Sequence, residues 1–123
     1  MTNPSVHILV VEDNVALQLV INKLLSKRGY RVTCVNDGLK ALKVQKENPV
    51  DLIFMDVSMP IMVGLTSTRE IRRISKPSAA VPIIALTAHH LTEQKAQCIA
   101  AGMDDFLTKP AKAAGDVYLS FSE

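Results

Sequence analysis

The sequence predicts an open, doubly wound α/β domain, in which helices cover both faces of a parallel sheet. Five short apolar runs recur along the 123 residues, with helix-compatible segments between them. Near-continuous apolar strands are expected where both faces of a parallel sheet are covered. Strand and helix alternate along the chain, which is typical of this fold class. The 48% apolar content of a chain this long supports one folded domain over residues 1–123, with an aliphatic core.

The predicted strands share an apolar, often β-branched composition. They are His7–Val11, Tyr30–Val35, Val50–Met55, Ile83–Leu86 and Phe106–Thr108. Each is short, bounded by polar or turn-forming residues, and of the length expected for a buried strand. These runs are therefore predicted to form a five-stranded parallel sheet.

The predicted helices lie between these strands. In the first, Val15–Arg28, apolar residues recur at helical spacing and Gly29 supplies the stop. The next three are expected over residues 38–47, 64–74 and 91–101. Residues 111–123 should form a fifth helix, but Gly115 interrupts them and 117–121 alternates apolar and polar residues like a strand. A core over 6–110 with an irregular or truncated last helix is therefore expected.

Composition and charge narrow the classes of partner. A net charge of +2 does not indicate nucleic-acid binding. The basic residues in and just after the third predicted helix are expected to form a solvated face; they are Arg69, Arg72, Arg73 and Lys76. The residues before the first predicted strand lack the basic start and apolar run expected of a signal peptide, and no apolar run approaches the ~20 residues of a membrane span. Cys34 and Cys98 match no metal or redox spacing and are expected to be reduced, small buried hydrophobes. A cytoplasmic protein without membrane insertion is predicted.

Polar residues that can carry chemistry follow the predicted strands. They are Glu12 and Asp13 after the first strand, Asp56 after the third, Thr87 after the fourth and Lys109 after the fifth. In an open parallel sheet, ligands bind outside the carboxyl ends of the strands, so these side chains should share one edge. Crowded carboxylates repel each other unless a cation neutralises them, and an all-oxygen donor set favours Mg²⁺. Metal and lysine could stabilise phosphoryl transfer to Asp56.

Each of these residues also has an ordinary structural interpretation. Asp13 could cap the first helix and Thr87 the fourth, while a lone lysine such as Lys109 is usually a solvated surface charge. The functional hypothesis depends on the five residues as a set, because each lies at the exit of a predicted strand.

Together with neighbouring residues, this set closely resembles the receiver domain of two-component response regulators. The resemblance rests on Glu12-Asp13, Asp56-Val-Ser-Met-Pro60, Gly64, Leu86-Thr87-Ala88 and Phe106-Leu-Thr-Lys109-Pro110, and covers about residues 6–110. It implies a flavodoxin-like sheet of order 2-1-3-4-5. It also implies that Asp56 accepts a phosphoryl group from a histidine kinase or histidine phosphotransfer protein. By the same resemblance, Asp13, Asp56 and the Ser58 backbone carbonyl bind Mg²⁺, Glu12 holds metal-bound waters, and Lys109 pairs with the phosphoryl group.

The resemblance further implies a switch formed by Thr87 and Phe106. Thr87 would move toward the phosphoryl oxygen and Phe106 would rotate inward behind it, shifting a pre-existing equilibrium. A core phenylalanine that never moves is the alternative for Phe106, and the sequence does not decide between the two.

Two other classes of protein fit the sequence less well. Phosphohydrolases of the haloacid-dehalogenase type need a second aspartate two residues after the nucleophile, where this chain has Ser58, and a substrate cap for which 123 residues leave no room. A flavin-binding flavodoxin needs phosphate-binding Ser, Thr and Gly donors where this chain has Glu12 and Asp13. A phosphoacceptor switch is therefore predicted rather than an enzyme acting on a metabolite. The sequence leaves open whether it stands alone or is tethered to a kinase.

Overall fold

Five parallel strands form one sheet in the computed structural model, which describes residues 6–57, 64–74, 80–87 and 92–108. The strands are β1 (His7–Val11), β2 (Arg31–Val35), β3 (Leu52–Asp56), β4 (Ile83–Thr87) and β5 (Asp105–Thr108). Their order is β2-β1-β3-β4-β5, and every neighbouring pair is parallel. The predicted fold class and strand order are confirmed. The predicted irregular segment, 111–123, lies outside the described residues.

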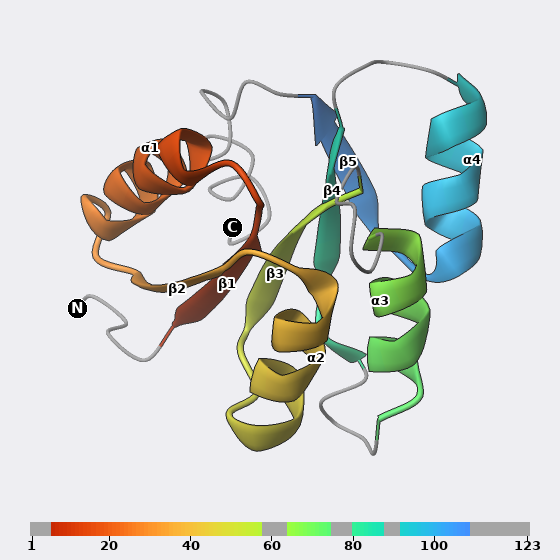
Figure 1. The fold of residues 1–123 in the computed structure, drawn as a ribbon, viewed down its shortest axis with the longest axis horizontal. Coiled ribbons are helices and arrows are strands. Elements are labelled where there is room, and N and C mark those ends of the chain that lie inside the picture. Colours follow the sequence, from red (N-terminus) through yellow and green to blue (C-terminus); the bar gives the residue numbers. More distant parts are fainter. Residues whose placement is uncertain (1–5, 58–63, 75–79, 88–91, 109–123) are drawn as a thin grey trace.

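Four helices cover the two faces of this sheet within the described ranges (Figure 1). They are α1 (Val15–Ser26), α2 (Gly38–Glu47), α3 (Gly64–Arg72) and α4 (Thr92–Ala101). In Figure 1, α1 lies on one side of the sheet, and α2, α3 and α4 follow one another along the other side. After α1, Gly29 adopts a φ of 91°, the left-handed conformation that only glycine adopts readily, so the predicted stop is present. No helix in these ranges is long and apolar enough to cross a membrane.

The core consists of two apolar layers, one on each face of the sheet. Alternate residues of a strand point to opposite faces, so β1 contributes Ile8 and Val10 to one layer and Leu9 and Val11 to the other. Partners from α1 pack in the first layer, while α2, α3 and α4 supply partners in the second. The central strand β3 is fully buried along its length. β3 is therefore packed against apolar side chains on both faces of the sheet.

Arg72, at the end of α3, joins three segments at the amino-terminal edge of the sheet. Its guanidinium donates to the carbonyls of Val81 at 2.6 Å and Gly102 at 2.9 Å, and pairs with the Asp104 carboxylate at 3.0 Å. That same carboxylate oxygen accepts from the backbone N–H of Ile83 at 2.8 Å. The prediction of a solvated basic face is therefore wrong for Arg72, because its side chain supplies hydrogen bonds that backbone carbonyls would otherwise lack.

Candidate functional site

Three carboxylates meet at the carboxyl edge of the sheet. Glu12 and Asp13 follow β1, Asp56 ends the adjacent strand β3, and one oxygen atom from each lies within 4.8 Å of the others. Glu12 and Asp56 are fully buried, whereas Asp13 is exposed to solvent. The structure thus brings together the three acids that the sequence placed at strand exits, and leaves one side of the cluster open.

Local hydrogen bonds hold Glu12 at the exit of β1. Its backbone N–H donates to the carbonyl of Val35 at 3.0 Å, which continues the pairing of β1 with β2. Its carboxylate accepts from the backbone N–H of Asn14 at 3.0 Å. The Asn14 side chain in turn accepts from the N–H of Leu17 at 3.1 Å, so Asn14 is the N-cap of α1. The alternative that Asp13 caps this helix is excluded, and the Asp13 carboxylate is exposed beside the cluster.

Asp56 is positioned by the strand that contains it and by the start of α3. Its neighbour Val57 donates to the carbonyl of Leu86 at 3.2 Å, which ties the end of β3 to β4. At Gly64, a Cβ atom would lie 2.5 Å from the Asp56 carbonyl oxygen and 2.9 Å from the Val57 Cα. Only glycine allows this approach, which explains why the sequence motif contains Gly64. The first turn of α3 therefore packs directly against the backbone that presents Asp56.

The other predicted site residues are described less completely. Thr87 is the last residue of β4, next to Leu86, which pairs with Asp56. The described part of α4 begins at Thr92, and the residues between it and Thr87 lie outside the described ranges. Phe106 lies in β5 and pairs with Ala85 of β4. Of Thr87 and Phe106 the structure describes the backbone alone, and Ser58 and Lys109 lie outside the described residues.

The donor set of the cluster fits a hard divalent cation. All three members offer carboxylate oxygens, and neither His nor Cys belongs to the cluster found in the described part of the chain. Two of the three carboxylates are fully buried, so their mutual repulsion is poorly screened by solvent. A divalent ion at this edge would offset that repulsion, and oxygen-rich sets of few carboxylates are those that Mg²⁺ occupies.

Comparison with known protein families shows which family the chain belongs to. The family described as "response regulator receiver domain" matches residues 8–115 of the chain. The chain belongs to this family. The receiver domain is the phosphorylatable module of two-component signalling, in agreement with the resemblance in the sequence.

The relatives of this receiver domain include sensor histidine kinases. The chain is 42% identical to "Sensor histidine kinase GacS" of Pseudomonas protegens over 106 residues, 85% of this chain but 12% of that protein. It is 36% identical to "Sensor histidine kinase RcsC" of Salmonella typhimurium over 109 residues, covering 89% of this chain and 11% of that protein. The chain therefore spans about an eighth or less of the length of these relatives.

Solved receiver domains share both fold and sequence with the chain. The receiver domain of sensor histidine kinase PA1611 from Pseudomonas aeruginosa is 43% identical, with a TM-score of 0.81 and coverage of 92% of both chains. That structure has a magnesium ion in its active site cleft. The receiver domain of the histidine kinase CKI1 from Arabidopsis thaliana, in complex with Mg²⁺ and BeF₃⁻, is 34% identical. Its TM-score is 0.83, and the match covers 94% of this chain and 89% of that one.

Proposed function

We propose that Asp56 of this receiver domain accepts a phosphoryl group, in a reaction that depends on Mg²⁺ bound beside it. The observation that carries the proposal is the cluster of Glu12, Asp13 and Asp56, whose oxygen atoms lie within 4.8 Å of one another. The magnesium ion in the related Pseudomonas aeruginosa receiver supports the choice of metal. Asp56 is the best candidate for the acceptor because it ends the central, fully buried strand and is fixed by packing on both sides.

The proposed reaction is transfer from a phosphohistidine to a carboxylate. An Asp56 carboxylate oxygen forms a bond to phosphorus while the phosphorus–nitrogen bond breaks, and the departing imidazole nitrogen takes up a proton. Mg²⁺ would supply the charge that offsets the incoming phosphoryl oxygens and the crowded carboxylates. The protein contributes a nucleophile whose backbone is held by β1, β4 and α3, so that little reorganisation is required.

The remaining roles follow the family resemblance residue by residue. We propose that Asp13, Asp56 and the Ser58 carbonyl are direct ligands of Mg²⁺ and that Glu12 acts through a metal-bound water. The exposure of Asp13 supports its assignment as a direct ligand, since the metal ion and the phosphodonor must reach the site from solvent. Lys109 and Thr87 are proposed to bind the phosphoryl oxygens, the lysine as a cation and the threonine as a hydrogen-bond donor. Phe106 is the proposed second switch residue; it lies on β5, the strand next to the one that ends at Thr87, and pairs there with Ala85.

The partner is proposed to be a histidine kinase or a histidine phosphotransfer protein that docks on α1. Of the five exposed large hydrophobic residues in the described ranges, three lie on this helix. They are Val15, Leu19 and Val20, exposed by 65%, 64% and 47%. This apolar surface begins two residues after Asp13, so a helix docked there would be next to the acidic cluster.

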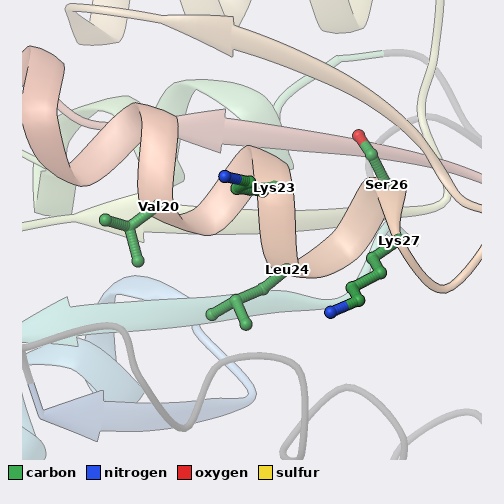
Figure 2. A pocket seen from close by; sticks show the side chains of 5 residues that line it. All are labelled: Val20, Lys23, Leu24, Ser26 and Lys27. Atoms are coloured by element: carbon green, nitrogen blue, oxygen red, sulfur yellow. The ribbon is translucent and has the colours of Figure 1, made fainter.

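A surface hollow extends the apolar surface of α1 away from the site. Its volume is about 650 Å³, and its described lining residues are Val20, Lys23, Leu24, Ser26 and Lys27. Figure 2 shows Val20, Leu24 and Lys27 projecting from one side of the helix. Lysines beside an apolar surface suit an amphipathic helix with acidic flanks, which supports a helical protein partner over nucleic acid.

The domain is proposed to be a switch without chemistry on any other substrate, promoting only its own phosphorylation and dephosphorylation. We propose that residues 1–123 form a single receiver domain that functions as part of a hybrid sensor kinase, supported by the full-length kinases among its relatives. The two free thiols, Cys34 and Cys98, support a reducing compartment such as the cytoplasm. Burial raises the pKa of both thiols, so neither is activated for redox chemistry.

The proposal is tested by phosphorylation with a small phosphodonor. Incubation with acetyl phosphate and Mg²⁺ should add one phosphoryl group, observed as a mass shift of the intact protein, and EDTA should prevent it. Asp56→Asn should abolish the labelling. Asp51→Asn is the matched control, because Asp51 is an exposed acid just before the opposite end of the same strand. Undiminished labelling of Asp56→Asn would show that the acceptor is another residue.

A further inference from the structure

We infer that Gln18 is a positioning residue for the metal site, acting through the backbone that joins Glu12 to Asp13. The inference rests on the proposed function, since it concerns how the proposed metal ligands are held. Gln18 lies on α1 and is partly buried. It does not belong to the acidic cluster and is not among the residues that the sequence motifs single out.

The Gln18 side-chain amide joins the exits of two strands. Its nitrogen Nε2 donates to the carbonyl oxygen of Glu12, just after β1, and to the carbonyl oxygen of Val35, the last residue of β2, at 3.2 Å. The Val35 oxygen also accepts from the backbone N–H of Glu12 at 3.0 Å. One side chain on α1 thereby fixes the helix, β2 and the first acid of the cluster to one another.

The orientation of the Glu12 carbonyl affects the placement of both acidic side chains that follow β1. It belongs to the planar peptide unit between Glu12 and Asp13, so its direction fixes ψ of Glu12 and φ of Asp13 together. These two dihedral angles set where both acidic side chains leave the backbone. A hydrogen bond that holds this carbonyl therefore holds the relative placement of two of the three carboxylates in the cluster.

Only a few side chains could do this from position 18. Side chains on a helix tilt toward its amino terminus, so residue 18 reaches back toward the exit of β1. An asparagine is one methylene shorter, and a glutamate would direct acceptor oxygens at two carbonyl oxygens while adding negative charge near the cluster. Glutamine supplies two N–H donors, which is what two carbonyls require.

The experiment compares Mg²⁺ affinity in two variants that each lose one glutamine amide. In Gln18→Met the side chain keeps its length but loses its donors, and the adjoining hollow of about 290 Å³ leaves room for the larger sulfur. Gln45→Met is the matched control, because the buried Gln45 holds the backbone N–H of Val50 at 3.0 Å, just before the opposite end of β3. Amide shifts in an NMR titration of the full chain with MgCl₂ give the dissociation constants, and thermal unfolding gives the stability of each variant.

Gln18→Met should weaken Mg²⁺ binding about tenfold, the low end of the range for groups that orient metal ligands. Gln45→Met should lose stability without a change in Mg²⁺ affinity. Acetyl phosphate labelling of Gln18→Met should be slow at low Mg²⁺ and return to the wild-type rate at saturating Mg²⁺. Gln18→Asn, with its shorter reach, should weaken binding in the same direction and replaces the Met variant if that one does not fold.

Equal Mg²⁺ affinities for Gln18→Met and wild type would overturn the inference while leaving the proposed function intact. A labelling deficit that persists at saturating Mg²⁺ would also overturn it, because the defect would then lie beyond metal binding. If the wild-type domain itself binds no Mg²⁺, the proposed function fails, and the positioning role with it.

Discussion

Substituting Gly64 with alanine should slow phosphorylation of Asp56 far more than it reduces stability. The added Cβ would lie 2.5 Å from the Asp56 carbonyl oxygen, whereas ordinary contacts begin at 3.4 Å, so relief requires a displacement of about 0.9 Å. The atoms in the way belong to the backbone of Asp56 and Val57 and cannot rotate aside as a side chain could. The end of β3 and the start of α3 must therefore move apart.

The expected magnitudes follow from that displacement. Overpacking of this kind costs about 1–3 kcal/mol of stability. A misplacement of about 1 Å at a reacting group can slow a reaction on the order of 100-fold. Gly64→Ala should thus lower the acetyl phosphate labelling rate by one to two orders of magnitude at saturating Mg²⁺, measured by intact mass over time.

The matched control is Gly29→Ala. Gly29 has a φ of 91° and nothing within 4 Å of its added Cβ, so the substitution costs about 1–2 kcal/mol through backbone strain alone. It follows α1 at the edge of the sheet away from the acids and should leave the labelling rate unchanged. If Gly64→Ala and Gly29→Ala lose similar stability and label equally fast, the contact between α3 and β3 does not position Asp56.

Two further predictions concern docking and pH. Leu19→Asp should abolish phosphoryl transfer from a phosphohistidine donor that labels the wild-type domain, while labelling by acetyl phosphate stays unchanged. Leu39→Asp, at a similarly exposed apolar position on α2, is the control. An equal loss of transfer from the phosphohistidine donor in both variants would refute docking on α1. Burial and the nearby Arg31 lower the pKa of His7, with Asp51 opposing them, so the folded state favours the neutral ring. Stability should therefore be full above the unfolded pKa of about 6.5 and fall as pH drops through it. The free energy of unfolding, measured with urea between about pH 5 and 8, should depend less steeply on pH in His7→Gln than in the wild type. An identical pH dependence in the two proteins would contradict the assignment to His7.

Much of the fold was predictable because it depends on local pattern. Near-continuous apolar strands identified a sheet covered on both faces, and the predicted strands agree with β1 to β5 within two residues at their ends. Parallel strands bring their carboxyl ends to one edge of the sheet, and this does not depend on the conformation of the connecting loops. The proximity of Glu12, Asp13 and Asp56 could therefore also be expected.

Features that depend on tertiary contacts were not predictable in the same way. Arg72 lies close in sequence to the basic residues Arg69 and Arg73, and nothing local distinguishes it from a solvated arginine. Its role comes from Val81, Gly102 and Asp104, which are distant in sequence and meet it only in the folded chain. Gln18 is similar, since its amide binds the carbonyl of Val35, 17 residues away. The capping of α1 by Asn14 rather than Asp13 was ambiguous because both residue types cap helices well.

These tertiary contacts explain how a cluster of like charges can be held in place. Fully buried Glu12 and Asp56 beside Asp13 oppose folding electrostatically, so stability alone would not select this arrangement. Three contacts restrain different parts of the site, and the first of them donates a hydrogen bond directly to a carboxylate. The Asn14 N–H holds the Glu12 carboxylate, the Gln18 amide holds the peptide that joins the first two acids, and Gly64 lets α3 pack against the backbone of Asp56. Because Gln18 and Gly64 supply no carboxylate to the cluster, a substitution at either can change metal binding or phosphorylation while leaving the charge of the site unaltered.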